Sequence, residues 1–199
     1  MRILGLDHSG GGGLAGGMVW TTTGIGPNAF DLSATRRAPG DQTRHDGRVQ
    51  ISARGDYAVR ATLELAAAYP STLSAQALAD AQGLPRKFLE AVLADLRRSG
   101  VVHAVRGADG GYVLSLAPTE VTIGMVLRAV DGPLAGVRGH RPEQTSYTGT
   151  SSHLPELWVA VRAAVRSVVD EVSLTEVMRG ELPARIKDLT AGPDAWQPR

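Results

Sequence analysis

The stretch that decides the fold runs from Ser74 to Gly100 and reads SAQALADAQGLPRKFLEAVLADLRRSG. Its first half predicts a short helix around Leu78, capped by Ser74 and ended by Gly83. Its second half carries apolar residues at the spacing of one helix face, namely Phe88, Leu89, Val92, Leu93 and Leu96. Only Gly83 and Leu84 separate the two helices. So tight a glycine-containing turn between two short helices predicts a helix-turn-helix.

The segments on either side complete a known arrangement. An amphipathic helix precedes the pair, with apolar residues at i, i+4 spacing: Tyr57, Ala61, Leu65 and Tyr69. After the pair, the pattern becomes that of two short strands, one with Val101, Val102 and Val105 and the other with Tyr112, Val113, Leu114 and Leu116. The step Asp109-Gly110 between them is typical of a hairpin turn. A hairpin directly after the second helix predicts a wing.

A second apolar pattern lies near the C-terminus. Thr122 is expected to cap a short helix that Gly132 ends, and the polar residues 134–153 then predict a long loop. Beyond the loop, apolar residues recur at alternating intervals of four and three, which is the period of a helix packing along another helix: Leu154, Trp158, Val161, Val165, Val168 and Val172. We expect these residues to form a dimer interface.

Composition narrows the classes of function. The formal net charge is +1, so any DNA contact must come from local clusters of basic residues. The chain has no cysteine, which excludes disulfides, thiolate metal sites and cysteine nucleophiles and fits a reducing compartment. No apolar run is long enough to span a membrane, and the glycines near the N-terminus argue against a secretory signal. We therefore expect a cytoplasmic protein with no membrane partner, no catalytic residues, no metal and no cofactor.

The predicted fold class is mainly α with a small β-hairpin. The expected organisation along the chain is a disordered or mis-assigned N-terminal extension (1–48), a winged helix-turn-helix domain (49–133), a flexible loop (134–153), a dimerisation helix with a C-terminal helical segment (154–190) and a loose tail (191–199). The glycine tract within the first segment lacks the lysine and the preceding strand of a phosphate-binding loop.

Two motifs resemble those of a known family. ISARGDYAVR at Ile51–Arg60 opens the resemblance, and VRGADGGY at Val105–Tyr112 marks the wing. Together with the helix pair, they resemble the Rrf-type winged-helix regulators, the group that contains IscR, NsrR and CymR. The resemblance covers roughly Val49 to Met178. It implies a homodimer with a long C-terminal dimerisation helix, bound to a pseudo-palindromic operator in double-stranded DNA.

Many members of that family carry an iron–sulfur cluster on three cysteines in the loop before the dimer helix. In this chain the equivalent stretch, about Val137 to Ser152, has no thiolate, so that mode of cluster binding is excluded by residue type. His140 and His153 stand in or beside the loop and are interpreted as ordinary loop residues. The chain thus resembles the branch without a cluster, and a small molecule, a partner protein or no effector at all remain open as the signal.

The helix-turn-helix places candidate DNA contacts on the first turns of its second helix. With Phe88, Leu89 and Val92 expected in the core, the outward side chains are Arg86, Lys87, Glu90 and Ala91. Arginine and lysine reach guanine, and glutamate accepts a hydrogen bond from cytosine. The alternative for these charges is an ordinary solvated helix face.

Further basic residues extend the expected surface. Arg106 at the wing suits a narrow minor groove, and the resemblance implicates the same residue; its alternative is a solvent-exposed turn. Phosphate contacts are predicted for Arg54 and Arg60 on the first helix and for Arg97 and Arg98.

These features predict a sequence-specific DNA-binding transcription regulator, acting as a dimeric repressor. The alternative is a winged-helix module that contacts proteins and does not bind DNA, which the near-neutral charge would suit. No constellation of residues supports an enzyme.

Overall fold

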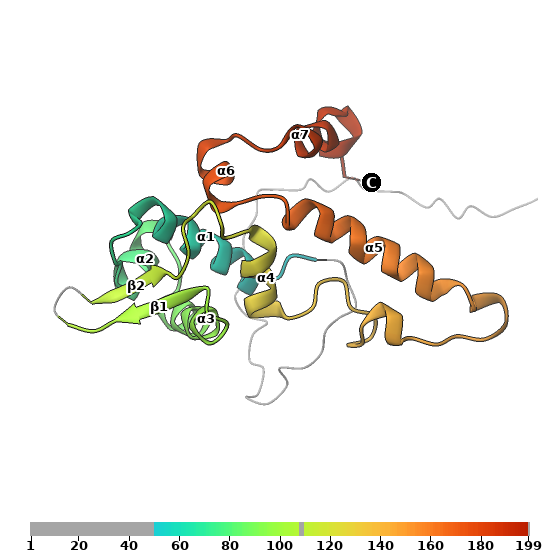
Figure 1. The fold of residues 1–199 in the computed structure, drawn as a ribbon, viewed down its shortest axis with the longest axis horizontal. Helices are drawn as coiled ribbons and strands as arrows, with labels where there is room; N and C mark the ends of the chain where they lie inside the picture. Colours follow the sequence, from blue (N-terminus) through green and yellow to red (C-terminus); the bar gives the residue numbers. More distant parts are fainter. Residues whose placement is uncertain (1–49, 108–109, 199) are drawn as a thin grey trace, which may run out of the picture. The chain divides into compact units, whose positions relative to one another are not determined.

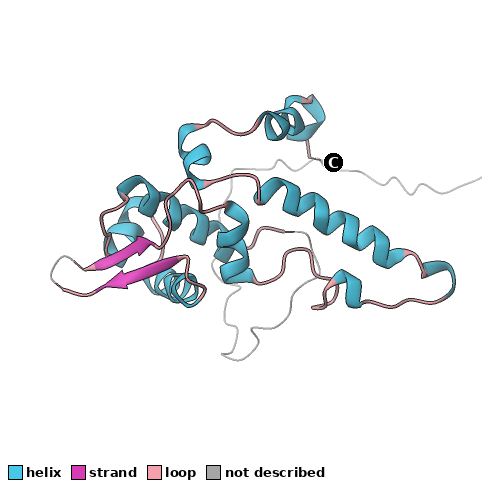
Figure 2. Cartoon of the chain, in the orientation of Figure 1, coloured by secondary structure: helices cyan, strands magenta, loops and turns pink. Residues whose placement is uncertain are grey.

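A computed structural model of the chain describes residues 50–107 and 110–198. Those residues form a mainly helical structure with one two-stranded antiparallel sheet, which confirms the predicted fold class (Figures 1 and 2). The expectations for residues 1–48 and the hairpin step at Asp109 lie outside the described residues. Within the described ranges, no helix combines the length and the apolar character needed to cross a bilayer.

The helix-turn-helix forms where the sequence predicts it. Helix α1 (Ala53–Ala68) begins at Ser52, whose hydroxyl accepts a hydrogen bond from the Gly55 N–H. Helix α2 (Ala75–Gln82) is capped in the same way by Ser74 and ends at Gly83, whose φ of 61° lies in the left-handed region that glycine favours. Helix α3 (Arg86–Arg98) follows directly and is the second helix of the pair.

The wing is a short antiparallel hairpin, made of β1 (Val102–Val105) and β2 (Gly111–Leu114). The first residues of β2, at the turn end of the hairpin, are tied to the segment between α1 and α2, because Leu73 and Tyr112 exchange two backbone hydrogen bonds of 3.0 and 2.8 Å. Gly111 allows this approach, since a Cβ there would lie 2.4 Å from the Leu73 carbonyl oxygen. The wing is therefore fixed to the rest of the domain near its turn, through β2.

The C-terminal part of the chain returns to this domain. Helix α4 (Ile123–Asp131) is capped by Thr122, as expected, and packs on α1. Much later in the chain, Ser173 forms a β-bridge with Thr122, and the Leu174 N–H donates to the Val121 carbonyl. Leu174, the first residue of α6 (Leu174–Arg179), is fully buried in the core. The helical core thus takes a residue from beyond position 133, where the sequence placed the end of the domain.

The segment predicted as a loop contains some regular structure. It holds two short 3-10 helices, η2 (Pro142–Gln144) and η3 (Gly149–Ser151), and Pro142 is buried. Helix α5 (Leu154–Val169) follows, packs against η2 and is joined to it by an ion pair between Arg162 and Glu143. The loop segment is therefore held against α5.

The C-terminal segment contains a further helix and a short turn. Helix α7 (Ala184–Ala191) is held to the end of α5, because Arg185 bonds both Ser167 and Glu171. The tail beyond it forms a 3-10 helix, η4 (Pro193–Trp196), and the Trp196 indole N–H donates to the Thr190 carbonyl. Within the tail that the sequence predicts to be loose, this turn is stabilised by Pro193 and by the indole contact.

Candidate nucleic-acid interface

The first turns of α3 present the expected side chains at the surface. Arg86, Lys87, Glu90 and Ala91 are all exposed. The Arg86 Nε lies 3.0 Å from the Glu90 Oε1, and its Nη1 donates to the Gln76 side-chain oxygen on α2 at 3.1 Å. Gln76, the second residue of α2, is not among the residues that the sequence predicts for the site, although the cap at Ser74 places it in the first turn of that helix. The Arg86 guanidinium is thus held by both helices of the motif.

Lys87 differs from Arg86 in having no held position. Its side chain forms no hydrogen bond or ion pair with any other residue in the described part of the chain. Its ammonium is therefore available to a phosphate or a base edge without breaking an existing contact. Ala91, one helical turn further on, adds a small apolar surface beside it.

Phe88 is not in the core, contrary to the expectation from the helix pattern. Its side chain is 42% exposed, whereas Leu89 and Val92 are fully buried. The Phe88 ring packs edge-to-face on Tyr57 of α1, with ring centroids 5.3 Å apart and planes at 85°. The reason is its position around the helix axis, because Phe88 lies at the edge of the buried face of α3. One side of its ring packs on α1 and the other side is exposed to solvent.

The wing presents Arg106 immediately after β1. Arg106 is exposed and makes no hydrogen bond or ion pair with the described residues. His103, Ala104 and Val105 of β1 are exposed as well. The described part of the wing therefore offers one exposed arginine next to an exposed strand.

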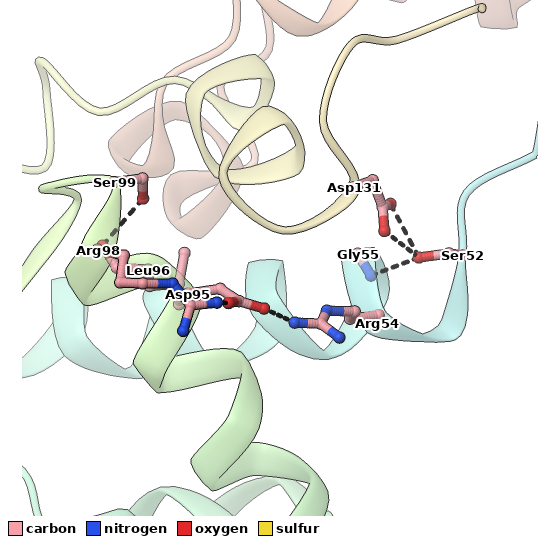
Figure 3. A network of polar contacts seen from close by, with 8 residues as sticks. All are labelled: Ser52, Arg54, Gly55, Asp95, Leu96, Arg98, Ser99 and Asp131. Carbon is pink, nitrogen blue, oxygen red and sulfur yellow. Dashed lines mark hydrogen bonds and ion pairs between the residues drawn. The ribbon is translucent and has the colours of Figure 1, made fainter. Parts of the chain in front are cut away.

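Arg54 has an internal partner. It forms an ion pair with Asp95 of α3, and Arg98 forms another with the same carboxylate (Figure 3). Asp95 is only 6% exposed, so this carboxylate is withdrawn from solvent between two guanidinium groups. A phosphate contact by Arg54 would have to compete with Asp95.

Arg60 is also engaged within the domain. Its Nε donates to the Gln82 side-chain oxygen at 2.9 Å, another of its nitrogens donates to the Gln82 carbonyl, and its guanidinium lies over the Tyr57 ring at 5.8 Å. The structure thus gives Arg54 and Arg60 roles in joining α1 to α3 and α2. Among the predicted basic contacts, the side chains of Lys87, Arg97 and Arg106 have no internal partners in the described ranges.

The apolar residues of α5 that the sequence predicts for a dimer interface are only partly buried. Leu154, Trp158, Val161, Val165 and Val168 lie on α5 and are partly exposed, and no residue of this helix is fully buried. The Trp158 indole N–H is buried without a hydrogen-bond partner among the described residues. Val172 does not belong to this stripe, because the helix ends at Val169 and Val172 is 5% exposed in the contact with α4. The apolar spacing of the sequence continues past Val169 and therefore does not reveal where α5 ends.

The residues that the structure describes do not form an iron site. The chain has no cysteine, and the described residues contain no group of three histidine, cysteine, aspartate or glutamate side chains that could hold a metal ion.

The comparisons with known proteins agree with this architecture. The model of the Rrf2 family, described as an iron-dependent transcriptional regulator, matches residues 51–180. A Mycobacterium tuberculosis chain named as an HTH-type transcriptional regulator is 42% identical over 142 residues, which cover 71% of this chain and 88% of that one. The HTH-type transcriptional regulator CymR of Bacillus subtilis is 32% identical over 130 residues, 65% of this chain and 89% of its own.

Two solved structures show the same fold. The structure of B. subtilis CymR, titled the global cysteine regulator, superposes with a TM-score of 0.56 at 31% identity and covers 66% of this chain and 97% of that one. The structure of T. potens IscR gives 0.53 at 29% identity, covering 66% and 87%. These similarities confirm the winged-helix fold. They do not favour the alternative of a winged-helix module that contacts proteins and does not bind DNA.

Proposed function

The chain belongs to the Rrf2 family of DNA-binding transcription regulators, and from that premise we propose that it is a homodimeric repressor that works without an iron–sulfur cluster. The observation that carries the proposal is α5: a helix of 16 residues with no fully buried residue and a partly exposed apolar stripe along its length. A second copy of the same helix would cover that stripe and bring two copies of α3 to one DNA duplex. A pseudo-palindromic operator follows from the two-fold symmetry of such a dimer.

The DNA-reading residues of the proposal are Lys87 and the Arg86–Glu90 pair on α3, with Ala91 beside them and Arg106 on the wing. Lys87 and Arg106 are exposed and have no partners among the described residues, so binding DNA costs them no internal contact. Arg86 is held by Glu90 and Gln76, which reduces the entropy lost when it meets a guanine.

The absence of cysteine excludes the usual cluster ligands, so the signal must reach this protein by another route. A small-molecule or protein effector, or constitutive repression, each fit the chain.

The test is the oligomeric state of the full chain and its DNA binding in parallel. Val165→Glu places a charge in the α5 stripe and is expected to give a monomer by analytical ultracentrifugation and to abolish cooperative binding to the operator. Ala163→Glu, on the opposite face of the same helix, is the matched control and should leave the dimer intact. A dimer that survives Val165→Glu, or a monomer that binds its operator fully, would overturn the proposed assembly.

A further inference from the structure

Phe88 is the large apolar side chain on the exposed part of the first turns of α3. It is the third residue of the helix and is 42% exposed, beside Lys87 and one turn before Ala91. An exposed phenyl ring loses the free energy that burial would supply. Its surface is therefore available to a partner that α3 meets.

The ring is held in place before any partner arrives. Tyr57 contacts it edge-to-face at 5.3 Å, and the Arg60 guanidinium covers the Tyr57 ring in turn. Arg60 is fixed by Gln82 at the end of α2. This chain of contacts orients Phe88 relative to all three helices, so the ring can meet a partner without first being ordered.

We propose that Phe88 reads a thymine by packing on the thymine 5-methyl group in the major groove. This inference rests on the proposed DNA contact of α3. Among the groups on the major-groove edge, the thymine methyl is the apolar one, and apolar side chains, phenylalanine included, recognise it. Ala91, on the same side of the helix, extends the apolar surface of Phe88.

The charged residues beside Phe88 determine how the surface of α3 would face the base edges of the DNA. Arg86 and Glu90 form a pair on the other flank of the helix, and Lys87 lies between that pair and Phe88. The helix thus presents a polar edge for hydrogen bonding beside an apolar edge for a methyl group. A half-site read by this surface contains a thymine next to the base pair that Arg86 or Lys87 contacts.

The test compares thymine with deoxyuridine, which lacks only the methyl group. Duplexes that the wild-type full chain selects from a random library are resynthesised with each thymine replaced in turn, and the Kd of each is measured. One thymine per half-site is expected to show about a four-fold loss on replacement, the factor that corresponds to ~0.8 kcal/mol for one buried CH₂ group. For Phe88→Ala the same replacement should have no effect.

Met178→Ala is the matched control, because Met178 is 41% exposed but lies on α6; it should keep the full four-fold loss. Phe88→Leu, which keeps an apolar side chain on Tyr57, guards against a folding defect and is expected to reduce the loss to below two-fold. If Phe88→Ala or Phe88→Leu shows the wild-type loss at every thymine, or no thymine methyl affects wild-type binding, the inference is wrong while DNA binding stands. If the wild type selects no duplex, the proposed function itself fails.

Discussion

The buried carboxylate of Asp95, in the last turn of α3, is paired with the guanidinium of Arg54, the second residue of α1 (Figure 3). Asp95 is 6% exposed, and Arg98 approaches the same carboxylate from the surface. A buried carboxylate requires such compensation, because charge withdrawn from water is costly when unpaired. The pair therefore fixes α3 against α1, the first helix of the domain.

Asp95→Asn is expected to destabilise the fold by about 1–3 kcal/mol, because it leaves Arg54 partly buried without a counter-charge. The exposure of Arg54 keeps the loss below that of a fully buried pair. Urea unfolding monitored by circular dichroism measures the change. Arg98→Ala is the control: its side chain is 73% exposed, and its loss should stay below about 1 kcal/mol. Equal effects of the two variants would contradict the assignment of Arg54 as the principal partner.

Gly111→Ala is expected to displace the start of β2, at the turn end of the wing. The added Cβ would meet the Leu73 backbone oxygen at 2.4 Å, and backbone cannot move aside as a flexible side chain can. A cost of about 1–3 kcal/mol in unfolding free energy is typical of such overpacking, and DNA affinity should fall with it. Gly192→Ala, where a Cβ meets nothing within 4 Å, is the control and should change neither quantity appreciably. Wild-type affinity in Gly111→Ala would show that the wing position does not matter for binding.

The pKa of Glu143 is lowered, first by a hydrogen bond from its own backbone N–H and then by the Arg162 guanidinium, which outweigh the opposing effect of burial. A carboxyl whose folded pKa is depressed adds stability above its unfolded pKa and loses it as the pH falls through the folded value. The contact of the 142–144 turn with α5 should therefore be intact at neutral pH and weaken in acid below the ordinary glutamate range. A carboxyl titration by NMR should give a low pKa for Glu143. In Arg162→Ala that pKa should rise only part of the way to normal, since the backbone bond remains, and an unchanged pKa would exclude Arg162 as a cause.

Lys87→Ala and Arg106→Ala should each weaken operator binding and, where the residue meets a phosphate, reduce the slope of log K against log salt by about one. If Lys87 reads a base instead, its loss should relax specificity at one position by about 1–3 kcal/mol. Fluorescence anisotropy over a range of salt concentrations distinguishes the two. Arg179→Ala, at the end of α6, is the control and should leave both quantities unchanged. Binding unaffected by both Lys87→Ala and Arg106→Ala would remove these residues from the interface.

Local sequence signals predicted most of the fold. The caps at Ser74 and Thr122, the turn at Gly83 and the buried stripe with Leu89 and Val92 specify their elements within a few residues, and the structure places them as expected. The winged hairpin follows from the same kind of local pattern.

The errors arose where an outcome depends on contacts far apart in the chain. Phe88 belongs to the apolar pattern, but its exposure is set by how far α1 covers the edge of α3. Val172 continues the period of α5, yet it packs against α4 after the helix has ended. The partner of Arg54 is 41 positions away, at Asp95, and no local signal reveals it.

Val172 and Leu174 are buried, so the connection between the C-terminal end of α5 and the helical core is short. Only Asp170 and Glu171 separate the last residue of α5 from Val172, and Asp170 is itself paired with Arg128 of α4. In a dimer joined through α5, the distance and the angle between the two copies of α3 would then be fixed. One base pair inserted between the half-sites turns one of them by about 35° around the duplex, and such an operator should bind only one half of the dimer at a time.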